Sequence, residues 1–161
     1  MQEVSTPAVR KMYKQDLECA AKVHQEAFPR QRSSYQWLEC NLNAAPRMLS
    51  YVALINHRCV GYIIWSQKSG FRPEVILELE QIAVAANYRG QGIGRQLIVA
   101  SLPDVKTQLS HQGAVLKHIV VTTRSDNHAQ RLYKESLGAE VEAVISNLYS
   151  ADEVFMVARH L

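Results

Sequence analysis

The sequence is short of cysteine, and the few cysteines it has exclude two classes of protein. Its 161 residues include three cysteines, Cys19, Cys40 and Cys59. An odd number at wide spacing fits neither a disulfide framework nor a CxxC metal or redox pair. We therefore expect a reducing, cytoplasmic location and no bound metal.

Long apolar runs and an excess of one charge are also missing. No stretch approaches the ~18 apolar residues of a membrane span, and the first ten residues, MQEVSTPAVR, lack the apolar core of a signal peptide. Lys and Arg number 18 against 15 Asp and Glu, which leaves a net charge of only +3. Dense basic blocks, which are typical of nucleic-acid binders, are absent. We expect neither a membrane nor a nucleic acid as partner.

Periodicity along the chain predicts one layered domain over residues 1–161. This length fits a single domain, and the seven glycines and five prolines are scattered without forming a linker. Pro103 predicts a kink or break in one helix. The order of elements indicates an α/β or α+β fold around a mixed sheet. The predicted elements are a strand at 9–12, helices at 16–28 and 33–45, strands at 51–55, 60–65 and 75–84, a helix at 94–109, a strand at 118–123, a helix at 127–137, and strands at 141–146 and 154–158.

A glycine-rich loop follows the strand that ends near Val84 and precedes a helix that begins near Gly92. It reads Arg89-Gly90-Gln91-Gly92-Ile93-Gly94. Such a loop exposes backbone N–H groups at the positive end of the helix dipole, and glycine allows a ligand to approach the chain closely. The loop therefore predicts a phosphate or pyrophosphate site. The alternative is a loop that only terminates a strand.

Two common phosphate-binding motifs do not match this loop. Counted from Gly90, a dinucleotide-binding GxGxxG motif needs a glycine at position 95, where the chain has Arg95. A P-loop needs Gly-Lys-Ser or Gly-Lys-Thr, and neither tripeptide occurs. The ligand is therefore held by a different kind of loop.

The motif Arg89-x-x-Gly92-x-Gly94, with the strand 79–84 before it and the helix motif Ala129-x-x-Leu132-Tyr133 after it, resembles the GCN5-related N-acetyltransferases. The resemblance covers most of the chain. It implies a mostly antiparallel central sheet, splayed between the fourth and fifth strands, and acetyl-CoA as acyl donor. Loop amides would hold the pyrophosphate and the strand backbone would pair with pantetheine. The residues so implied are Ile82, Ala83, Val84, Arg89, Gly90, Gln91, Gly92, Ile93, Gly94 and Arg95.

One departure from the family pattern concerns the start of the 127–137 helix. Family members usually have Asn seven residues before the helix tyrosine, but here Asn127 lies six before Tyr133 and Asp126 occupies the usual place. Gly138 likewise lies five residues after the tyrosine rather than four. The resemblance implies a pantetheine contact from Asn127, or from Asp126 in its place. A plain helix N-cap is the alternative for either residue.

Acetyl transfer to an amine requires a base, because alkylammonium groups have pKa values near ~10. Glu78 and Glu80 are two apart on a strand and share one face, where mutual repulsion would raise the pKa of at least one of them. The resemblance places Glu78 where the histone-acetylating branch has its base, and Glu80 where the polyamine-acetylating branch has its glutamate. We favour Glu80. Solvated strand residues are the alternative for both, and His118 is a third candidate base or a structural residue.

A proton donor would help the coenzyme A thiolate to leave. The resemblance gives this role to Tyr133, whose phenol stays protonated at pH 7. The alternative for Tyr133 is an aromatic packed on an apolar face. Arg124, Arg131 and Lys134 would either meet the 3′-phosphate of the coenzyme or remain solvated.

The acyl acceptor is the least defined part of the prediction. Residues 147–156 are similar to the final loop and strand of ribosomal-protein N-terminal acetyltransferases, although with a single Tyr and a shorter loop. We expect acetyl transfer to a primary amine, on a peptide or a small molecule, by direct attack in a ternary complex. The alternatives are a non-catalytic coenzyme A binding regulatory module and a toxin that acetylates aminoacyl-tRNA. The final edge strand offers a surface for a homodimer.

Overall fold

The computed structural model describes residues 5–161, and the first four residues of the MQEVSTPAVR segment lie outside it. The order of helices and strands is the predicted one. The elements are β1 (Ala8–Lys11), η1 (Lys14–Asp16), α1 (Leu17–Ala27), α2 (Ser34–Leu42), β2 (Met48–Ile55), β3 (Arg58–Gln67), β4 (Glu74–Val84), η2 (Ala86–Tyr88), α3 (Ile93–His111), β5 (Val115–Arg124), α4 (Ala129–Leu137), β6 (Glu140–Ile145) and β7 (Glu153–Ala158).

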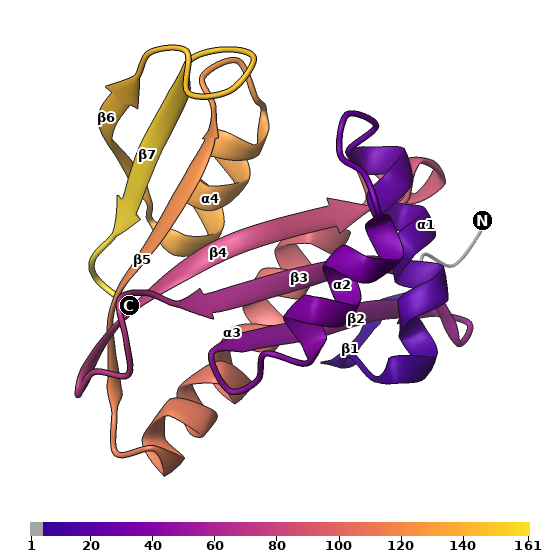
Figure 1. The fold of residues 1–161 in the computed structure, drawn as a ribbon, viewed down its shortest axis with the longest axis horizontal. Helices are drawn as coiled ribbons and strands as arrows, with labels where there is room; N and C mark the ends of the chain where they lie inside the picture. The colour runs from indigo at the N-terminus through magenta and orange to yellow at the C-terminus, as the bar shows by residue number, and fades with distance from the viewer. Residues whose placement is uncertain (1–4) are drawn as a thin grey trace. The chain divides into compact units, whose positions relative to one another are not determined.

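The strands form a mixed sheet with hydrogen-bonded order β1-β2-β3-β4-β5-β7-β6 (Figure 1). β4 and β5 are parallel, whereas the pairs β1–β2, β5–β7 and β6–β7 are antiparallel. This confirms the predicted α/β fold with a mixed, mostly antiparallel sheet. The recorded pairs between β4 and β5 run from Glu74 to Glu78. The splay expected beyond that point stays a prediction.

Contacts divide the described chain into two compact units, and the division passes along β4 and α3. Unit 1 extends up to Trp65 and includes Gln81–Val105. Unit 2 comprises Ser66–Glu80 and Lys106–Leu161.

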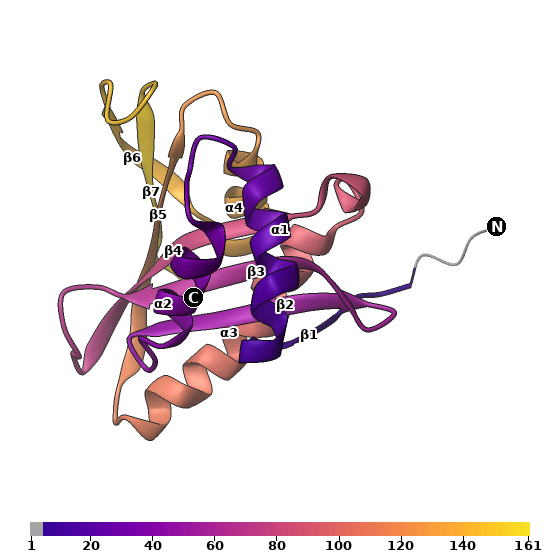
Figure 2. The ribbon, with the colours of Figure 1, turned by 45° about the vertical axis from the view of Figure 1, so that its right-hand side comes forward.

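Unit 1 has helices on both faces of its strands. α1 and α2 cover one face of β2 and β3, and the first part of α3 lies on the other (Figures 1 and 2). Strand alternation explains this, because successive side chains point to opposite faces. On β3, Tyr62 and Ile64 join the core beneath α1 and α2, while the Trp65 indole donates a 2.9 Å hydrogen bond to Ser101 Oγ on α3.

Gly61 allows α3 to cross β3 closely. A Cβ atom at this position would lie 2.9 Å from the Ala83 carbonyl oxygen and 3.3 Å from Leu97 Cδ1. Any larger residue would have to displace the β4 backbone, which cannot move cheaply. The helix that begins after the glycine-rich loop is thereby fixed against the sheet of unit 1.

Unit 2 contains the first part of β4 with β5, β7, β6 and α4, together with the ends of β3 and α3. β5 pairs with β7 from Ile119 to Arg124, and β7 pairs with β6 on its other side (Figure 1). α4 ends at Gly138, whose φ of 68° is the left-handed conformation that commonly closes a helix. The predicted end of this helix is confirmed.

α3 continues through Pro103, so the predicted break is wrong. Its nineteen residues form one helix with Pro103 inside. Proline removes a single N–H donor, and buried Leu97, Ile98 and Val105 hold the helix on both sides of it. The kink that was the other possibility stays a prediction.

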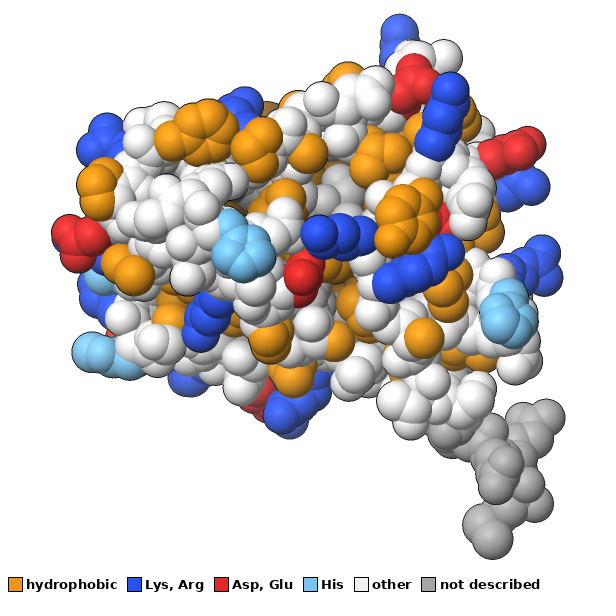
Figure 3. Space-filling model, turned by 90° about the horizontal axis from the view of Figure 1, so that it is seen from below, with side chains coloured by type: hydrophobic (Ala, Val, Ile, Leu, Met, Phe, Trp, Pro, Cys, Tyr) orange, Lys and Arg blue, Asp and Glu red, His pale blue; other side chains and the backbone are white. Residues whose placement is uncertain are grey.

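The surface shows no concentration of basic residues on the face drawn in Figure 3, where Lys and Arg side chains stand among acidic and apolar ones. Within residues 5–161, no helix is long and apolar enough to cross a membrane.

Candidate functional site

The glycine-rich loop of unit 1 joins the end of β4 to the start of α3. Gly90 and Gly92 have φ values of 74° and 79°, a region that favours glycine. Apart from the adjacent residues, a Cβ atom at either position would meet no atom of residues 5–161 within 4 Å. These glycines are thus required by the backbone conformation and leave open space beside the chain, which suits close approach of a ligand.

Backbone donors at the start of α3 face the loop. The first intrahelical bond runs from the Gln96 N–H to the Gly92 carbonyl, so the amides of Ile93, Gly94 and Arg95 precede the helical ladder. Such amides, at the positive end of a nineteen-residue helix, form an anion site in many proteins. Buried Ile93 fixes this turn from below.

Side chains of the loop hold its own backbone in place. Arg89 Nε donates to the Val84 carbonyl at 3.0 Å, and Gln91 Nε2 donates to the Asn87 carbonyl at 3.3 Å. The Ala86 N–H donates to the Glu26 carboxylate. Arg89, which the resemblance assigns to coenzyme binding, thus also shapes the loop.

The predicted pantetheine strand occupies the end of β4. Ala83 is buried, whereas Ile82 and Val84 are half-buried on the opposite face. Among the described residues, these three lie beyond the part of β4 that pairs with β5. Their backbone role stays a prediction.

The two candidate bases, in unit 2, differ in their surroundings. Glu78 is half-buried, and its carboxylate lies 2.9 Å from the Lys68 ammonium. Glu80 is exposed on the same face of β4. Lys68 balances the charge of Glu78 and so weakens the repulsion expected between the two glutamates. Which of the two glutamates acts as the base stays a prediction.

Tyr133 is buried on α4. Its side chain is 5% exposed, and this burial raises the pKa of the phenol to about 12. The phenol therefore holds its proton throughout the neutral range. The packing agrees with the apolar-face alternative and also with a proton donor, and it does not separate the two.

His118 is half-buried on β5, opposite Ile76 of β4. Among the described residues, its Nδ1 atom is buried without a hydrogen-bond partner. The role of His118, as a candidate base or a structural residue, stays a prediction.

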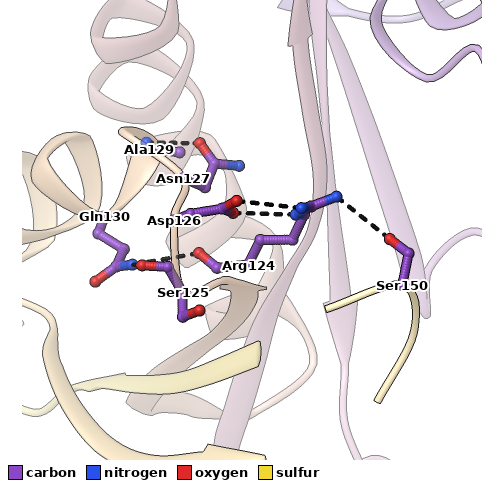
Figure 4. Close-up of polar contacts among 7 residues, drawn as sticks. All are labelled: Arg124, Ser125, Asp126, Asn127, Ala129, Gln130 and Ser150. Carbon is purple, nitrogen blue, oxygen red and sulfur yellow. Dashed lines mark hydrogen bonds and ion pairs between the residues drawn. The ribbon is translucent and has the colours of Figure 1, made fainter. Parts of the chain in front are cut away.

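The polar residues before α4 are engaged with one another (Figure 4). Arg124 donates to both Asp126 oxygens, at 3.0 and 3.1 Å, and to Ser150 Oγ at 3.2 Å. Asn127 Oδ1 accepts the Ala129 N–H at 2.8 Å, one residue ahead of His128, which occupies the N-cap position of α4. Asp126 is paired with Arg124. The pantetheine contact stays a prediction.

The other basic candidates on α4 are solvated. Arg131 pairs with Glu135 one turn along the helix at 2.7 Å, and both side chains are exposed, as is Lys134. Surface pairs of this kind contribute little to stability. They leave the assignment of the 3′-phosphate site open.

The cysteines are free and differ in reactivity. Cys40 is exposed and Cys59 is buried, and burial raises the pKa of the Cys59 thiol to about 12. Cys19 Sγ contacts the Cys59 carbonyl at 3.2 Å. Within residues 5–161, no group of three or more His, Cys, Asp or Glu side chains is placed to hold a metal ion.

A buried glutamine of unit 1 was not among the predicted site residues. Gln81 lies between Glu80 and Ile82 and is 8% exposed. Its Oε1 accepts hydrogen bonds from Trp37 and Tyr62. The available signal was a polar residue in the inward-facing position of an alternating strand.

Comparison with known proteins gives a consistent assignment. A family model described as the acetyltransferase (GNAT) family matches residues 8–139. N-alpha-acetyltransferase 30 of Schizosaccharomyces pombe is 36% identical over 89 residues, 55% of each chain. The chain thus spans about half the length of that curated relative.

Solved structures share the fold at low sequence identity. The ribosomal-protein-S18-alanine N-acetyltransferase of Escherichia coli has a TM-score of 0.73 at 23% identity, covering 96% of this chain and 94% of that one. Ard1 of Thermoplasma volcanium has a TM-score of 0.75 at 21% identity, covering 98% and 99%. Arabidopsis thaliana NAA60, solved with acetyl-CoA, has a TM-score of 0.76 at 18% identity, covering 96% and 99%.

Proposed function

The chain belongs to the acetyltransferase (GNAT) family, and from this premise we propose that it transfers an acetyl group from acetyl-CoA to a primary amine. The observation that carries the proposal is the loop from Arg89 to Gly94, with two open glycines of positive φ at the start of a long helix. The open space beside this loop and the free backbone amides that follow it suit a pyrophosphate. The two units together would form one N-acetyltransferase domain.

The residues that would hold the coenzyme are those that the resemblance names. The loop amides and Arg95 would bind the pyrophosphate, and the backbone of Ile82–Val84 would bind the pantetheine arm. Asn127 would add a contact to that arm. Acetyl-CoA supplies the thioester, which is the activated acyl group.

Side chains of this protein would accept and donate the protons that the transfer requires. Glu80 would remove a proton from the ammonium form of the acceptor, with Glu78 held as an ion pair by Lys68. The amine then forms a bond to the acetyl carbon as the bond to sulfur breaks. Tyr133, whose phenol has a pKa of about 12 and is protonated at neutral pH, would donate its proton to the departing sulfur. It would regain a proton from the acylated nitrogen, which releases one as the amide forms.

Transfer would be direct, without an acetylated cysteine. Cys59 is buried with a raised pKa, so little thiolate forms at neutral pH, and Cys40 lies exposed on α2. The amine itself is a sufficient nucleophile for a thioester. The free thiols also support a reducing location such as the cytoplasm.

We further propose a peptide α-amine as the preferred acceptor. Two of the relatives named above are acetyltransferases of protein N-termini by name. Small amines are the second candidate, because an aminoglycoside 6′-acetyltransferase shares the fold with a TM-score of 0.74. The loop between α1 and α2, residues 28–33, would border the acceptor, because it lines a cavity that carries charged and polar side chains.

The test is turnover on an amine panel with thiol release as readout. Peptides with different N-terminal residues, polyamines and aminoglycosides are compared at equal concentration with acetyl-CoA. The proposal expects turnover on at least one class, with peptides first. Binding of acetyl-CoA without turnover on any amine would point instead to a non-catalytic regulatory module. Turnover only on aminoacyl-tRNA, with salt-dependent RNA retention, would indicate the toxin.

A further inference from the structure

A buried hydrogen-bond network in unit 1 centres on Gln81. The Gln81 Oε1 atom accepts the Trp37 indole N–H at 2.9 Å and the Tyr62 hydroxyl at 2.7 Å. Its Nε2 atom donates to Gln31 Oε1 at 3.2 Å. One amide thus joins β4, β3, α2 and the loop between α1 and α2.

The network continues from Gln31 to His24. Gln31 Oε1 lies 2.8 Å from His24 Nε2, and His24 Nδ1 lies 2.8 Å from Ser34 Oγ. A carbonyl oxygen only accepts, so His24 donates from Nε2, and in its neutral form the Nδ1 atom accepts the Ser34 hydroxyl. His24 has no solvent exposure. The loop at residues 28–33, through Gln31, and the start of α2, through Ser34, are therefore both bonded to the His24 side chain.

The two residues joined by the Gln81–Gln31 hydrogen bond, called the tie below, differ in how firmly their backbones are held. Gln81 lies in a strand of the sheet, where ladder hydrogen bonds fix the backbone. Gln31 lies in an exposed loop, where its N–H donates to the Phe28 carbonyl at 3.0 Å within a single turn. Loss of the side-chain tie would therefore release the loop and leave the strand in place.

The same loop lines a cavity of about 510 Å³. One wall comes from α1 and the other from the loop and the start of α2, and the lining carries charges of both signs. It consists of Glu18, Ala21, Lys22, Gln25, Gln31, Arg32, Ser33, Ser34 and Tyr35. The position of Gln31 sets the shape of this cavity, because Gln31 belongs to the lining and to the network.

We propose that Gln81 and Gln31 are positioning residues that hold the 28–33 loop in the conformation that receives the acceptor. This rests on the proposed function, in which the loop borders the amine substrate. An apolar residue at position 81 would pack as well as the neighbouring Leu77 and Leu79, but it would provide no acceptor for Trp37 and Tyr62 and no donor for Gln31.

The test uses Gln31→Met, which keeps side-chain length and removes the hydrogen bonds at an exposed position. Gln81→Met and the double variant complete the cycle, and Gln36→Met, an exposed glutamine of α2, is the matched control. Trypsin cleaves after Arg30 and Arg32, so native-state proteolysis reports loop opening without any assay of activity.

Gln31→Met removes the bonds to His24 and Gln81, and we expect it to be cleaved in the loop at least about fivefold faster than wild type, the factor that corresponds to one net hydrogen bond. The acceptor KM rises by a similar factor, while the acetyl-CoA Kd is unchanged. The double variant is cleaved no faster than Gln31→Met alone, because Gln31→Met already removes the bond to Gln81 together with the bond to His24. Gln36→Met behaves as wild type.

Wild-type cleavage and acceptor KM in folded Gln31→Met would overturn the proposal, as would additive effects in the double variant. Gln81→Met also removes the hydrogen-bond acceptor of Trp37 and Tyr62, so this variant can fail to fold. In that case the result for Gln31→Met alone decides the test. A wild-type protein that acetylates no amine would overturn the proposed function and the acceptor role together. Cleavage rates would then still show whether the tie holds the loop.

Discussion

The glycine-rich loop of unit 1 and the glutamate–tyrosine group of unit 2 would share one reaction, but they depend on different parts of the chain. The loop offers backbone amides, and its glycines are required by φ values of 74° and 79°. Glu78, Glu80 and Tyr133 act through side chains whose chemistry depends on their surroundings. A site made of backbone groups can therefore be predicted from residue spacing, whereas a site made of side chains can be assigned only when their contacts are known.

The largest effect is expected in unit 2, for Glu80→Gln. A general base contributes ~10²–10⁴-fold, so turnover at pH 7 should fall by about that factor. Activity should recover in part at high pH, where the free amine is abundant. The measurement is kcat/KM for the best amine between pH 6 and 10. If kcat/KM at pH 7 falls by less than about threefold, Glu80 is not the general base and is a solvated strand residue.

Glu78→Gln serves as the matched control for Glu80→Gln. It makes the same change two residues away on the same face, and it removes the partner of Lys68. We expect a smaller loss than for Glu80→Gln. The opposite order would transfer the role of base to Glu78.

The next largest effect is expected in the loop, for Gly92→Ala. Added atoms there meet no protein, but they would occupy the space beside the amides and weaken acetyl-CoA binding by about 10- to 100-fold. Gly113→Ala is the control, since Gly113 has a φ of 71° and equally open surroundings in unit 2. Both variants lose about 1 kcal/mol of stability from the left-handed conformation. Calorimetric titration should find weaker binding for Gly92→Ala alone; equal affinities would place the pyrophosphate elsewhere.

A smaller effect is expected for Tyr133→Phe, about tenfold in the chemical rate, because a thiolate is already a stable leaving group. Acetyl-CoA affinity should stay near wild type, since the ring and its packing remain. The ratio of wild-type to variant rates should be constant from pH 7 to pH 9, because the Tyr133 pKa is about 12. Single-turnover rates across pH provide the measurement. A folded variant with wild-type rates would make Tyr133 a core residue.

The raised Tyr133 pKa also predicts a change in stability. The unfolded phenol titrates near 10 and the folded one near 12, so the folded state holds the proton that the unfolded state releases. This contribution is fully present below about pH 10 and is lost as pH rises towards 12. Denaturant unfolding should show that Tyr133→Phe loses less stability than wild type over that interval. Parallel losses in the two proteins would contradict the burial of the phenol.

The smallest effects concern the cysteines. Cys40→Ser and Cys59→Ser should keep turnover within about twofold of wild type, since neither thiol is needed for direct transfer. Iodoacetamide at pH 8 should modify exposed Cys40 and spare Cys59, whose pKa is about 12. Peptide mapping of the alkylated protein checks this. Rapid labelling of Cys59 would show that its burial is incomplete.

The sequence predicted the order of elements and the position of the loop, because hydrophobic periods and glycine spacing are local features. The ends of elements were less accurate. β2 begins at Met48 and not Tyr51, and α2 ends at Leu42 and not near residue 45. Strand ends depend on pairing partners, and a single sequence does not display them.

Long-range side-chain contacts were the part that could not be predicted. Gln81 meets Trp37 and Tyr62, which are 44 and 19 residues away in sequence. The pair of Lys68 with Glu78 arises because β4 follows directly after the strand and turn that carry Lys68. Such contacts are set by tertiary packing.

Direct transfer from acetyl-CoA to an amine is tested most directly by a single-turnover experiment read by intact mass. The protein is mixed in excess with acetyl-CoA, with and without the best amine of the panel, and quenched over time. The account predicts thiol release only when the amine is present, acetylated amine in equal amount, and an unchanged protein mass. An acetyl adduct on Cys19, Cys40 or Cys59 that forms without amine and is removed by amine would contradict it.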